Sequence, residues 1–232
     1  MKRVRGFTLV ELLVALFVMS LLAVLAWRGI DGMTRAKTST EARADEVLTL
    51  QVGLAQWTAD LDAMEQLPRM KAIEWNGRVL RLTRRSTASI TDGVLVVGWT
   101  RRDVNGVSTW LRWQSAPVVT RGDLEQAWLR ADQWSQNAGD ADRAREVAIA
   151  PLDDWQIFFF RENAWTNPQS SDVTSIATGR GGTPPPGTPG IAEGAQMPEG
   201  VRVVLELPAG RAVSGTVTRD WVRPQVGGKA VQ

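Results

Sequence analysis

The chain has 232 residues, enough for one domain of ordinary size and an extension, and it contains no Cys, His or Tyr. Disulfides, thiolate or imidazole metal ligands, a Cys nucleophile and any catalytic triad with a His base are therefore excluded. Its 44% hydrophobic and 22% charged residues exclude both a disordered chain and a multi-span membrane protein.

The N-terminal part is dominated by an apolar run at residues 7–27, FTLVELLVALFVMSLLAVLAW. A helix of about 20 apolar residues spans a bilayer. The basic residues Lys2, Arg3 and Arg5 before the run predict that the N-terminus stays on the cytoplasmic side. An ordinary secretory signal peptide is the competing interpretation. Residues 26–29, directly after the run, include the bulky Trp27 and the charged Arg28 and so provide no cleavage site of that kind.

Glu11 is the exceptional residue of this run, because an ionised carboxylate inside a bilayer is energetically costly. We therefore expect it to have a positive partner. Cleavage between Gly6 and Phe7 supplies one, since the new amine of Phe7 lies four residues before Glu11 on the same helical face. Cleavage also removes three of the 27 basic residues. The 24 that remain against 25 acidic residues give a net charge of −1, with no electrostatic footprint for nucleic acid.

A single long helix is expected from about Phe7 to about Met64, since no Pro occurs before Pro68. Residues 31–46 are polar nearly all round, so this part of the helix is solvated or touches other subunits. Beyond it, apolar residues repeat at spacings of three and four: Val47, Leu50, Leu54, Trp57, Leu61 and Met64. This stripe predicts a helix packed against its own domain, with a coiled coil between chains as the alternative.

After Pro68 the apolar period falls to two, which indicates antiparallel strands. We predict hairpins at 72–75 with 78–83 around Asn76-Gly77, at 94–101 with 107–114 around 103–106, and at 201–207 with 212–218 around 208–210. Further strands are expected at 146–150 and 155–162, and a short helix at 123–135. In the second hairpin, Trp110 and Arg112 face one side while Leu111 and Trp113 face the other. The predicted fold class is α+β, with a mostly antiparallel sheet wrapped around the helix stripe.

Residues 166–200 interrupt this pattern, and 178–190 read TGRGGTPPPGTPG. A Pro/Gly-rich surface insertion is the simpler interpretation, and a proline motif that binds a partner is the alternative. The tail after Pro224 is expected to fray.

Acidic pairs are the candidates for a catalytic or metal site. Asp60 and Asp62 lie two apart on the helix and face different ways, and the pairs at 140/142 and 153/154 lack the ligand spacing of a calcium loop. No nucleophile elbow or phosphate-binding loop occurs. We therefore expect the two loop pairs to be solvated acids, and we expect no metal, no cofactor and no enzyme activity. Interleaved Arg and Trp at 99–102 and 110–113 offer another hypothesis, the stacking of single-stranded nucleic acid. Trp rings covered by Arg stems at a sheet surface explain the same pattern.

Residues 5–16, RGFTLVELLVAL, closely resemble the processing signal of type IV pilins and pseudopilins. The resemblance implies that a prepilin peptidase cuts between Gly6 and Phe7 and methylates the new N-terminus of Phe7, and that Glu11 serves filament assembly. It also implies the pseudopilin fold. The chain would then divide into a leader (1–6), a transmembrane or filament-core helix half (7–27), a periplasmic helix half (28–64) and a β-rich head (68–224).

Further segments are similar to the J-type (GspJ-like) minor pseudopilins of type II secretion: residues 26–31, AWRGID; residues 110–113, WLRW, with Arg121 at the turn that follows; residues 152–160 followed by Trp165; and residues 197–203, MPEGVRV. The Pro/Gly-rich loop and Ala164, where a Gly is usual, depart from that pattern. The resemblance implies a structural subunit at the pseudopilus tip that nucleates assembly with I- and K-type minor pseudopilins, for protein export across the outer membrane. It also implies a single-pass inner-membrane protein with its head in the periplasm. A minor pilin of a type IV pilus is the alternative.

The mixed charges and small residues of 31–46 make this helix segment, with the adjoining helix surface, the expected docking site for the I-type partner. The basic residues on which this docking is expected to depend are Arg35, Lys37 and Arg43. Strands 94–114 are the next candidate for that site.

Overall fold

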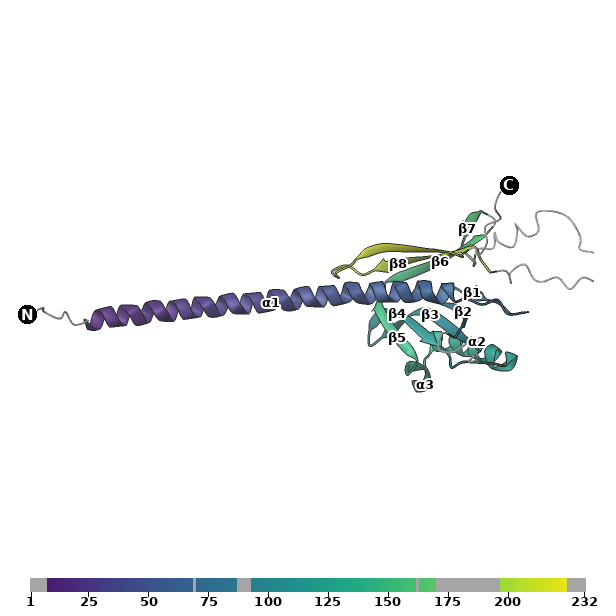
Figure 1. The fold of residues 1–232 in the computed structure, drawn as a ribbon, viewed down its shortest axis with the longest axis horizontal. Helices are drawn as coiled ribbons and strands as arrows, with labels where there is room; N and C mark the ends of the chain where they lie inside the picture. The colour runs from purple at the N-terminus through teal and green to yellow at the C-terminus, as the bar shows by residue number, and fades with distance from the viewer. Residues whose placement is uncertain (1–7, 69, 87–92, 162, 170–196, 225–232) are drawn as a thin grey trace, which may run out of the picture. The chain divides into compact units, whose positions relative to one another are not determined.

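The computed structural model describes residues 8–68, 70–86, 93–161, 163–169 and 197–224 (Figure 1). The chain divides into two compact units, Met1–Asp45 and Glu46–Gln232, and we call the second unit the head. Helix α1 (Leu9–Asp62) contributes residues to both units, and every strand that the described residues form lies in the head. The predicted leader and C-terminal tail, and most of the Pro/Gly-rich loop, lie outside the described residues.

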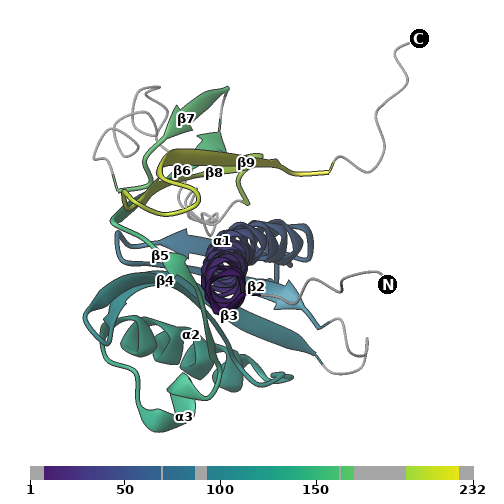
Figure 2. The same cartoon turned by 90° about the vertical axis from the view of Figure 1, so that its left-hand side faces the viewer.

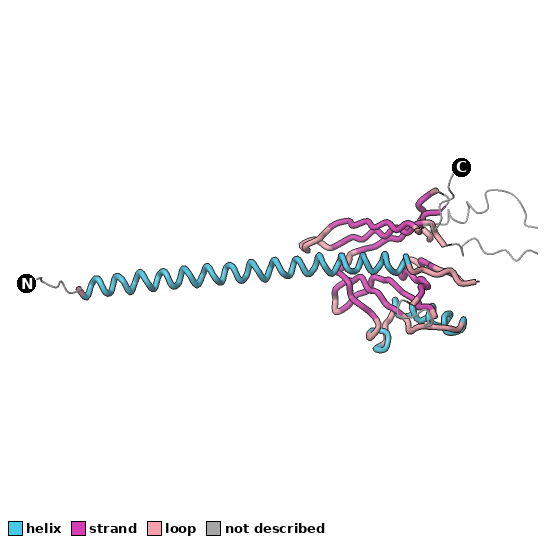
Figure 3. The backbone as a smooth tube through the Cα atoms, viewed as in Figure 1, coloured by secondary structure: helices cyan, strands magenta, loops and turns pink. Residues whose placement is uncertain are grey.

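Helix α1 is a continuous helix of 54 residues (Figure 3). It ends at Asp62 rather than at Met64, because the chain there turns into an extended path along strand β2 (Val79–Arg85). Met64 forms an isolated bridge with Arg84, and the N–H of Glu65 donates to the carbonyl of Thr83 at 2.9 Å. The helix is therefore replaced by sheet-like pairing before Pro68 is reached.

The first sheet of the head, sheet A, has five antiparallel strands in the order β1-β2-β3-β4-β5. The remaining strands of this sheet are β1 (Ile73–Trp75), β3 (Val94–Val104), β4 (Val107–Gln114) and β5 (Glu146–Pro151). The two predicted hairpins and the fifth strand are thus present. Helix α2 (Arg121–Gln136) and the short α3 (Asp140–Arg143) lie between β4 and β5 in the chain.

In the β1–β2 and β3–β4 hairpins of sheet A, Gly occupies different positions of the turn. Between β3 and β4, Val104 pairs with Val107, and Asn105 and Gly106 both have positive φ (52° and 82°), as a type I′ turn requires. Between β1 and β2, the N–H of Asn76 pairs with the carbonyl of Val79, so the turn residues are Gly77 (φ 88°) and Arg78. The predicted Asn76-Gly77 turn was wrong by one residue. A Gly at the first central position is typical of a type II′ turn instead.

The second sheet, sheet B, has four antiparallel strands in the order β7-β6-β8-β9. Its strands are β6 (Asp154–Arg161), β7 (Ala164–Thr166), β8 (Gly200–Leu207) and β9 (Gly215–Val222). The strand predicted at 212–218 was wrong in position, because the loop after β8 continues to Gly215 (φ 84°), and β9 then pairs Trp221 with Val201. Strand β7 was missed.

The C-terminal segment of α1 packs between the two sheets, with β1–β5 on one side and β6–β9 on the other (Figure 1). One core cluster joins Leu50, Trp57 and Leu61 of α1 to residues of both sheets. Helix α2 covers the opposite face of sheet A (Figure 2). There a second core cluster joins Leu111 and Trp113 of β4 to Leu124 of α2. The expected single sheet around the helix is therefore two sheets, and sheet A is buried on both faces.

Strand β4 shows this two-sided burial directly. Trp110 belongs to the cluster beneath α1, whereas Leu111 and Trp113 belong to the cluster beneath α2, so the predicted alternation of faces is confirmed. Helix α2 is capped by the hydroxyl of Thr120, which accepts from the N–H of Asp123 at 3.2 Å. Its buried residues include Leu124, Trp128 and Ala131, as its spacing predicted.

Candidate functional site

The first turn of α1 is closed by Thr8 and Glu11. The backbone N–H and the hydroxyl of Thr8 each donate to Oε2 of Glu11 at 2.9 Å, and the N–H of Glu11 donates to Oγ1 of Thr8 at 3.3 Å. This reciprocal pair is a capping box, with Thr at the N-cap and Glu three residues later. Glu11 thus has polar partners within its own chain before any cleavage. The predicted processing residues Gly6 and Phe7 lie outside the described residues.

The apolar half of α1 has no protein covering. From Leu9 to Leu25 all the large apolar side chains are exposed, between 45% for Val18 and 74% for Leu9. An 18-residue window of this helix has a mean hydropathy of 2.7, and none of it is buried, so α1 is long and apolar enough to cross a membrane. The hydroxyl of Ser20 donates to the carbonyl of Phe17 at 2.8 Å. A continuous apolar surface of this size requires lipid or another protein around it.

The predicted spine residues lie in the head part of α1. Leu50, Trp57 and Leu61 are buried, with Trp57 fully inaccessible, while Val47 and Leu54 are half-buried. The indole of Trp57 meets Trp99 at 5.4 Å in an edge-on arrangement and Trp110 at 6.0 Å between ring centroids. Because this stripe is occupied by the sheets, it is not available for a coiled coil between chains.

The polar segment 31–45 largely satisfies its own charges. Arg35 pairs with Asp31 at 2.9 Å and Lys37 with Glu41 at 3.6 Å, each one helical turn apart. The hydroxyls of Thr34, Thr38 and Thr40 donate to carbonyls four residues earlier. Two of the three basic residues on which we expected a charged docking site to depend are therefore paired within the helix.

Asp60 is the residue whose role the sequence reasoning missed. Its carboxylate is fully buried at the end of α1 and accepts five hydrogen bonds. Arg112 donates through Nε to Oδ2 at 2.7 Å and through Nη2 to Oδ1 at 2.8 Å, and Arg84 Nη1 donates to Oδ1 at 2.5 Å. The indole of Trp99 and the amide of Gln56 donate at 3.0 and 2.9 Å.

This cluster ties α1 to strands β2, β3 and β4. The sequence indicated only that Asp60 and Asp62 face different ways, and it assigned no role to Asp60. The available signal was its position next to Leu61 and three residues after Trp57, which places it on the buried side of the helix. The neighbouring Asp62 accepts from the indole N–H of Trp221 in β9 at 2.8 Å, so the two acids bind opposite sheets.

An ion pair on the exposed side of sheet B joins Arg202 of β8 to Asp220 of β9. Arg202 donates through Nε and Nη2 to the two carboxylate oxygens of Asp220 at 2.6 Å each, and its guanidinium lies 4.3 Å from the ring centroid of Trp165. The hydrogen bond from Arg202 holds the pKa of Asp220 below its ordinary value. This geometry fixes the register of β8 against β9.

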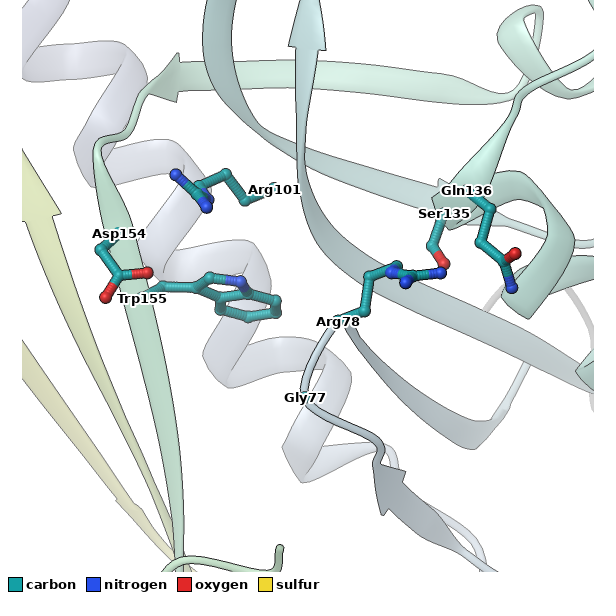
Figure 4. Close-up of a pocket in the computed structure, with 7 residues that line it drawn as sticks. All are labelled: Gly77, Arg78, Arg101, Ser135, Gln136, Asp154 and Trp155. Atoms are coloured by element: carbon teal, nitrogen blue, oxygen red, sulfur yellow. The ribbon is translucent and has the colours of Figure 1, made fainter.

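A polar pocket of about 500 Å³ lies between the β1–β2 turn, the end of α2 and the start of β6 (Figure 4). Its lining includes Arg78, Arg101, Gln136, Asp154 and Trp155. Arg101 donates to the carbonyl of Asp153. Within the described residues, no group of three acidic side chains is placed to hold a metal ion, and the pocket offers no nucleophile with an adjacent base.

The Trp residues proposed for nucleic-acid stacking are not accessible. Trp99, Trp110 and Trp113 are all fully buried, so none presents a face to a base. The simpler alternative, Trp at a sheet surface, was also wrong for these three, because both faces of sheet A are covered. Arg112 over Trp99 and Arg102 over Trp134, at 6.0 and 5.7 Å, retain the predicted Arg–Trp pairing inside the head.

Comparison with known proteins matches residues 1–27 to the family described as "Prokaryotic N-terminal methylation motif". The chain therefore carries the methylation motif of prokaryotic prepilin-type proteins, and the resemblance of its N-terminus to type IV pilins and pseudopilins is confirmed. A search of curated proteins found no match.

Among solved structures, the chain is similar to one chain of the GspK-GspI-GspJ complex from the type 2 secretion system of enterotoxigenic Escherichia coli. The sequence identity is 17% and the TM-score is 0.43, over 78% of this chain and 99% of the other. The α+β fold follows from this chain's own helix and antiparallel sheets.

Proposed function

We propose that this chain is a minor pseudopilin of the type II secretion system, a structural subunit at the tip of the pseudopilus that nucleates assembly for protein export. The observation that carries the proposal is the methylation motif at residues 1–27, which continues without interruption into an exposed apolar helix joined to an α+β head. Such a chain is built to be anchored by one helix and to present a folded domain beyond it. It performs no catalysis.

In this proposal α1 anchors the chain in the inner membrane and the head lies in the periplasm. The basic residues before the apolar run favour this orientation. Prepilin peptidase cuts between Gly6 and Phe7 and methylates Phe7. Glu11 then gives up its hydrogen bonds to Thr8 and pairs with a positive group, either the new amine of Phe7 or one in a neighbouring subunit. The bonds to Thr8 belong to the first helical turn, and cleavage between Gly6 and Phe7 changes that turn.

The J type is supported by the sequence resemblances at 26–31, 110–113 and 197–203. The structure adds a physical reason for the second of these segments. It places Arg112 on Asp60 and Trp110 in the core, so it maintains the connection of α1 to sheet A. The partners of a J-type subunit are the I- and K-type minor pseudopilins.

The test uses the full chain in the bacterium that makes it. Mass spectrometry of membrane-extracted protein should show a chain that begins at N-methylated Phe7, and Gly6→Val should leave the leader attached. Gly29→Val is the matched control, since a side chain there meets nothing within 4 Å. The mature protein should co-purify with I- and K-type pseudopilins, and its loss should abolish secretion. Extended surface fibres that depend on it would assign it to a type IV pilus instead.

Two substitutions separate the charge of Glu11 from its role in the helix cap. Glu11→Gln keeps a side chain that fits the capping box but removes the charge, whereas Glu11→Val removes both. If charge is needed for assembly, both variants should insert in the membrane and fail to assemble. Normal assembly of Glu11→Gln would show that only the helix cap matters.

A further inference from the structure

The polar pocket of the head, where the β1–β2 turn, the end of α2 and the start of β6 meet, has no part in the proposed function. Its volume of about 500 Å³ lies within the range of about 300–1,000 Å³ that is usual for ligand sites. Arg78 from the turn and Arg101 from β3 both line it, and they lie on opposite sides of the indole of Trp155 (Figure 4). The pocket therefore places two cations around one aromatic ring.

Most hydrogen-bond donors of this pocket are unused. The guanidinium of Arg78 is exposed and has no hydrogen bond or ion pair within the described residues. Arg101 donates through Nη1 to the carbonyl of Asp153, which leaves its Nε and Nη2. The side chain of Trp155 is only 7% exposed, and its N–H has no acceptor in the described part of the chain, yet this N–H is not sealed in the core as that of Trp57 is. Together these groups suit a ligand that supplies oxygen acceptors.

The charge of the pocket determines which anion fits it. Arg78 and Arg101 each carry a positive charge, and Asp154 carries a negative one without an ion-pair partner among the described residues, so the lining is positive by a single charge. A carboxylate neutralises this lining, whereas a phosphate ester, with a charge of about −1.5 to −2, leaves an excess of negative charge. The planar carboxylate also matches the fork of N–H groups on a guanidinium. The ligand is therefore expected to be a carboxylate.

The size of the pocket and the acceptors in its lining indicate that the carboxylate belongs to a peptide. A water molecule occupies about 30 Å³ of liquid, so a carboxylate alone fills only a small part of the pocket. Asp154 offers its carboxylate oxygens, and Gln136, whose Nε2 donates to Asp132 at 2.9 Å, keeps its carbonyl oxygen as an acceptor. These acceptors require N–H groups, which a small carboxylate lacks and a peptide backbone supplies.

We propose that the pocket lined by Arg78, Arg101 and Trp155 binds an acidic peptide segment of another protein. The carboxylate of the peptide lies between the two guanidinium groups, and its backbone N–H groups face Asp154 and Gln136. A chain end and an acidic side chain present the same two oxygens, so either can supply the carboxylate. The inference goes beyond the proposed function and does not depend on it. Because both arginines are exposed, binding weakens as the salt concentration rises.

The experiment uses the full chain in detergent micelles, labelled with ¹⁵N at its indole nitrogens. The probes are acetyl-triglycine, which ends in a carboxylate, its C-terminal amide, which lacks only that charge, and acetylated glycyl-glutamyl-glycine amide, which carries the carboxylate on a side chain. We expect a carboxylate peptide to shift the indole N–H resonance of Trp155 saturably and to bind at least about tenfold more tightly than the neutral amide, equivalent to roughly 1.4 kcal/mol. The tighter of the two carboxylate peptides identifies the source of the carboxylate. Trp155→Phe assigns the resonance, and calorimetry measures the affinity independently.

Variants of exposed arginines test the geometry. Arg78→Gln should weaken binding of the tighter peptide at least about tenfold, and Arg78→Lys should weaken it less, because it keeps the charge and loses only the planar fork. Arg223→Gln is the matched control and should leave the affinity unchanged. Arg223 follows β9 at the end of sheet B where Val222 pairs with Gly200, whereas Asp154 pairs with Glu206 at the other end. All three variants should keep the thermal unfolding midpoint, since both arginines are exposed.

Four results would overturn the inference: no binding of either carboxylate peptide, equal binding of the neutral amide, an unchanged affinity in Arg78→Gln, or resonance shifts that spare Trp155. Acetate that binds as tightly as the peptides would show a site for small anions only and would overturn the peptide as its ligand. None of these measurements involves cleavage after Gly6 or assembly with other subunits, so the proposed function is tested separately.

Discussion

Replacement of Asp60 by Asn should be among the most destabilising single substitutions in the head. The substitution keeps the shape of the side chain but removes the negative charge between Arg84 and Arg112, whose side chains are only 7% and 11% exposed. The new amide also turns one acceptor into a donor, opposite groups that all donate. Two guanidinium groups then remain buried without a counter-charge.

The size of the loss follows from the burial of the pair. Breaking a buried ion pair by removing one partner costs about 3–5 kcal/mol, because the remaining charge is uncompensated. A domain of this kind has a free energy of unfolding of about 5–15 kcal/mol, so Asp60→Asn should remove a large part of it. The triple variant Asp60→Leu, Arg84→Met, Arg112→Met removes all three charges and should recover most of the loss, since well-packed apolar residues often replace a buried ion pair without cost.

The assay is urea unfolding of a fragment that begins near Asp31 and lacks the apolar half of α1, after a check that the wild-type fragment unfolds cooperatively. Circular dichroism is the better probe, because the indole of Trp99 donates to Asp60 and its fluorescence would change without unfolding. A loss below about 1 kcal/mol in Asp60→Asn, or a triple variant no more stable than the single one, would refute the claim that the carboxylate neutralises the buried arginines.

Three further predictions use the same fragment. Trp57→Ala should cost about 3–5 kcal/mol, because the side chain is fully buried against Trp99 and Trp110, and a loss under about 1 kcal/mol would contradict the burial. Gly53→Ala should destabilise despite its better helix propensity, since the new Cβ would lie 2.1 Å from Cγ2 of Ile149. Adding Ile149→Ala should then cost less than it does in wild type, and strictly additive losses would argue against the clash. Asp220→Asn should lower stability at pH 7 by less than about 1 kcal/mol, since the pair is exposed. Because the folded pKa of Asp220 lies below its ordinary 3.8, that difference should persist above about pH 4 and shrink as pH falls through the folded pKa. A difference that grows in acid would contradict the sign.

Local patterns predicted the elements of this fold better than their arrangement. The stripe from Val47 to Met64 and the turn signal at 103–106 depend on residues close in the chain. The structure contains the buried helix face and the hairpin, although β3 extends to Val104 and only Asn105 and Gly106 form the turn. The division into two sheets depends on which strands pair across long separations, such as β6 with β8, and no local signal carries that information. The position of β9 was misjudged for a related reason, because burial of Trp221 against α1 determines its register.

For the candidate site too, the part built from neighbouring residues could be predicted and the part built from distant residues could not. The motif at residues 5–16 is a continuous segment and was recognised from sequence. Its reciprocal cap between Thr8 and Glu11 follows from the same spacing. The five-bond environment of Asp60 draws on Gln56, Arg84, Trp99 and Arg112, residues that only the folded chain brings together.

The position of α1 between two sheets also determines how the head bears mechanical load. A force applied along the helix axis would act in shear on every contact of segment 46–62 at once: the indole cluster around Trp57, the bonds of Asp60 to sheet A, and that of Asp62 to sheet B. Such contacts must break together rather than one after another, so the extraction barrier is high and the rate of forced unfolding is low. Peeling one sheet sideways would break its contacts in sequence and need less force. The head is therefore strongest against tension that reaches it through its own helix.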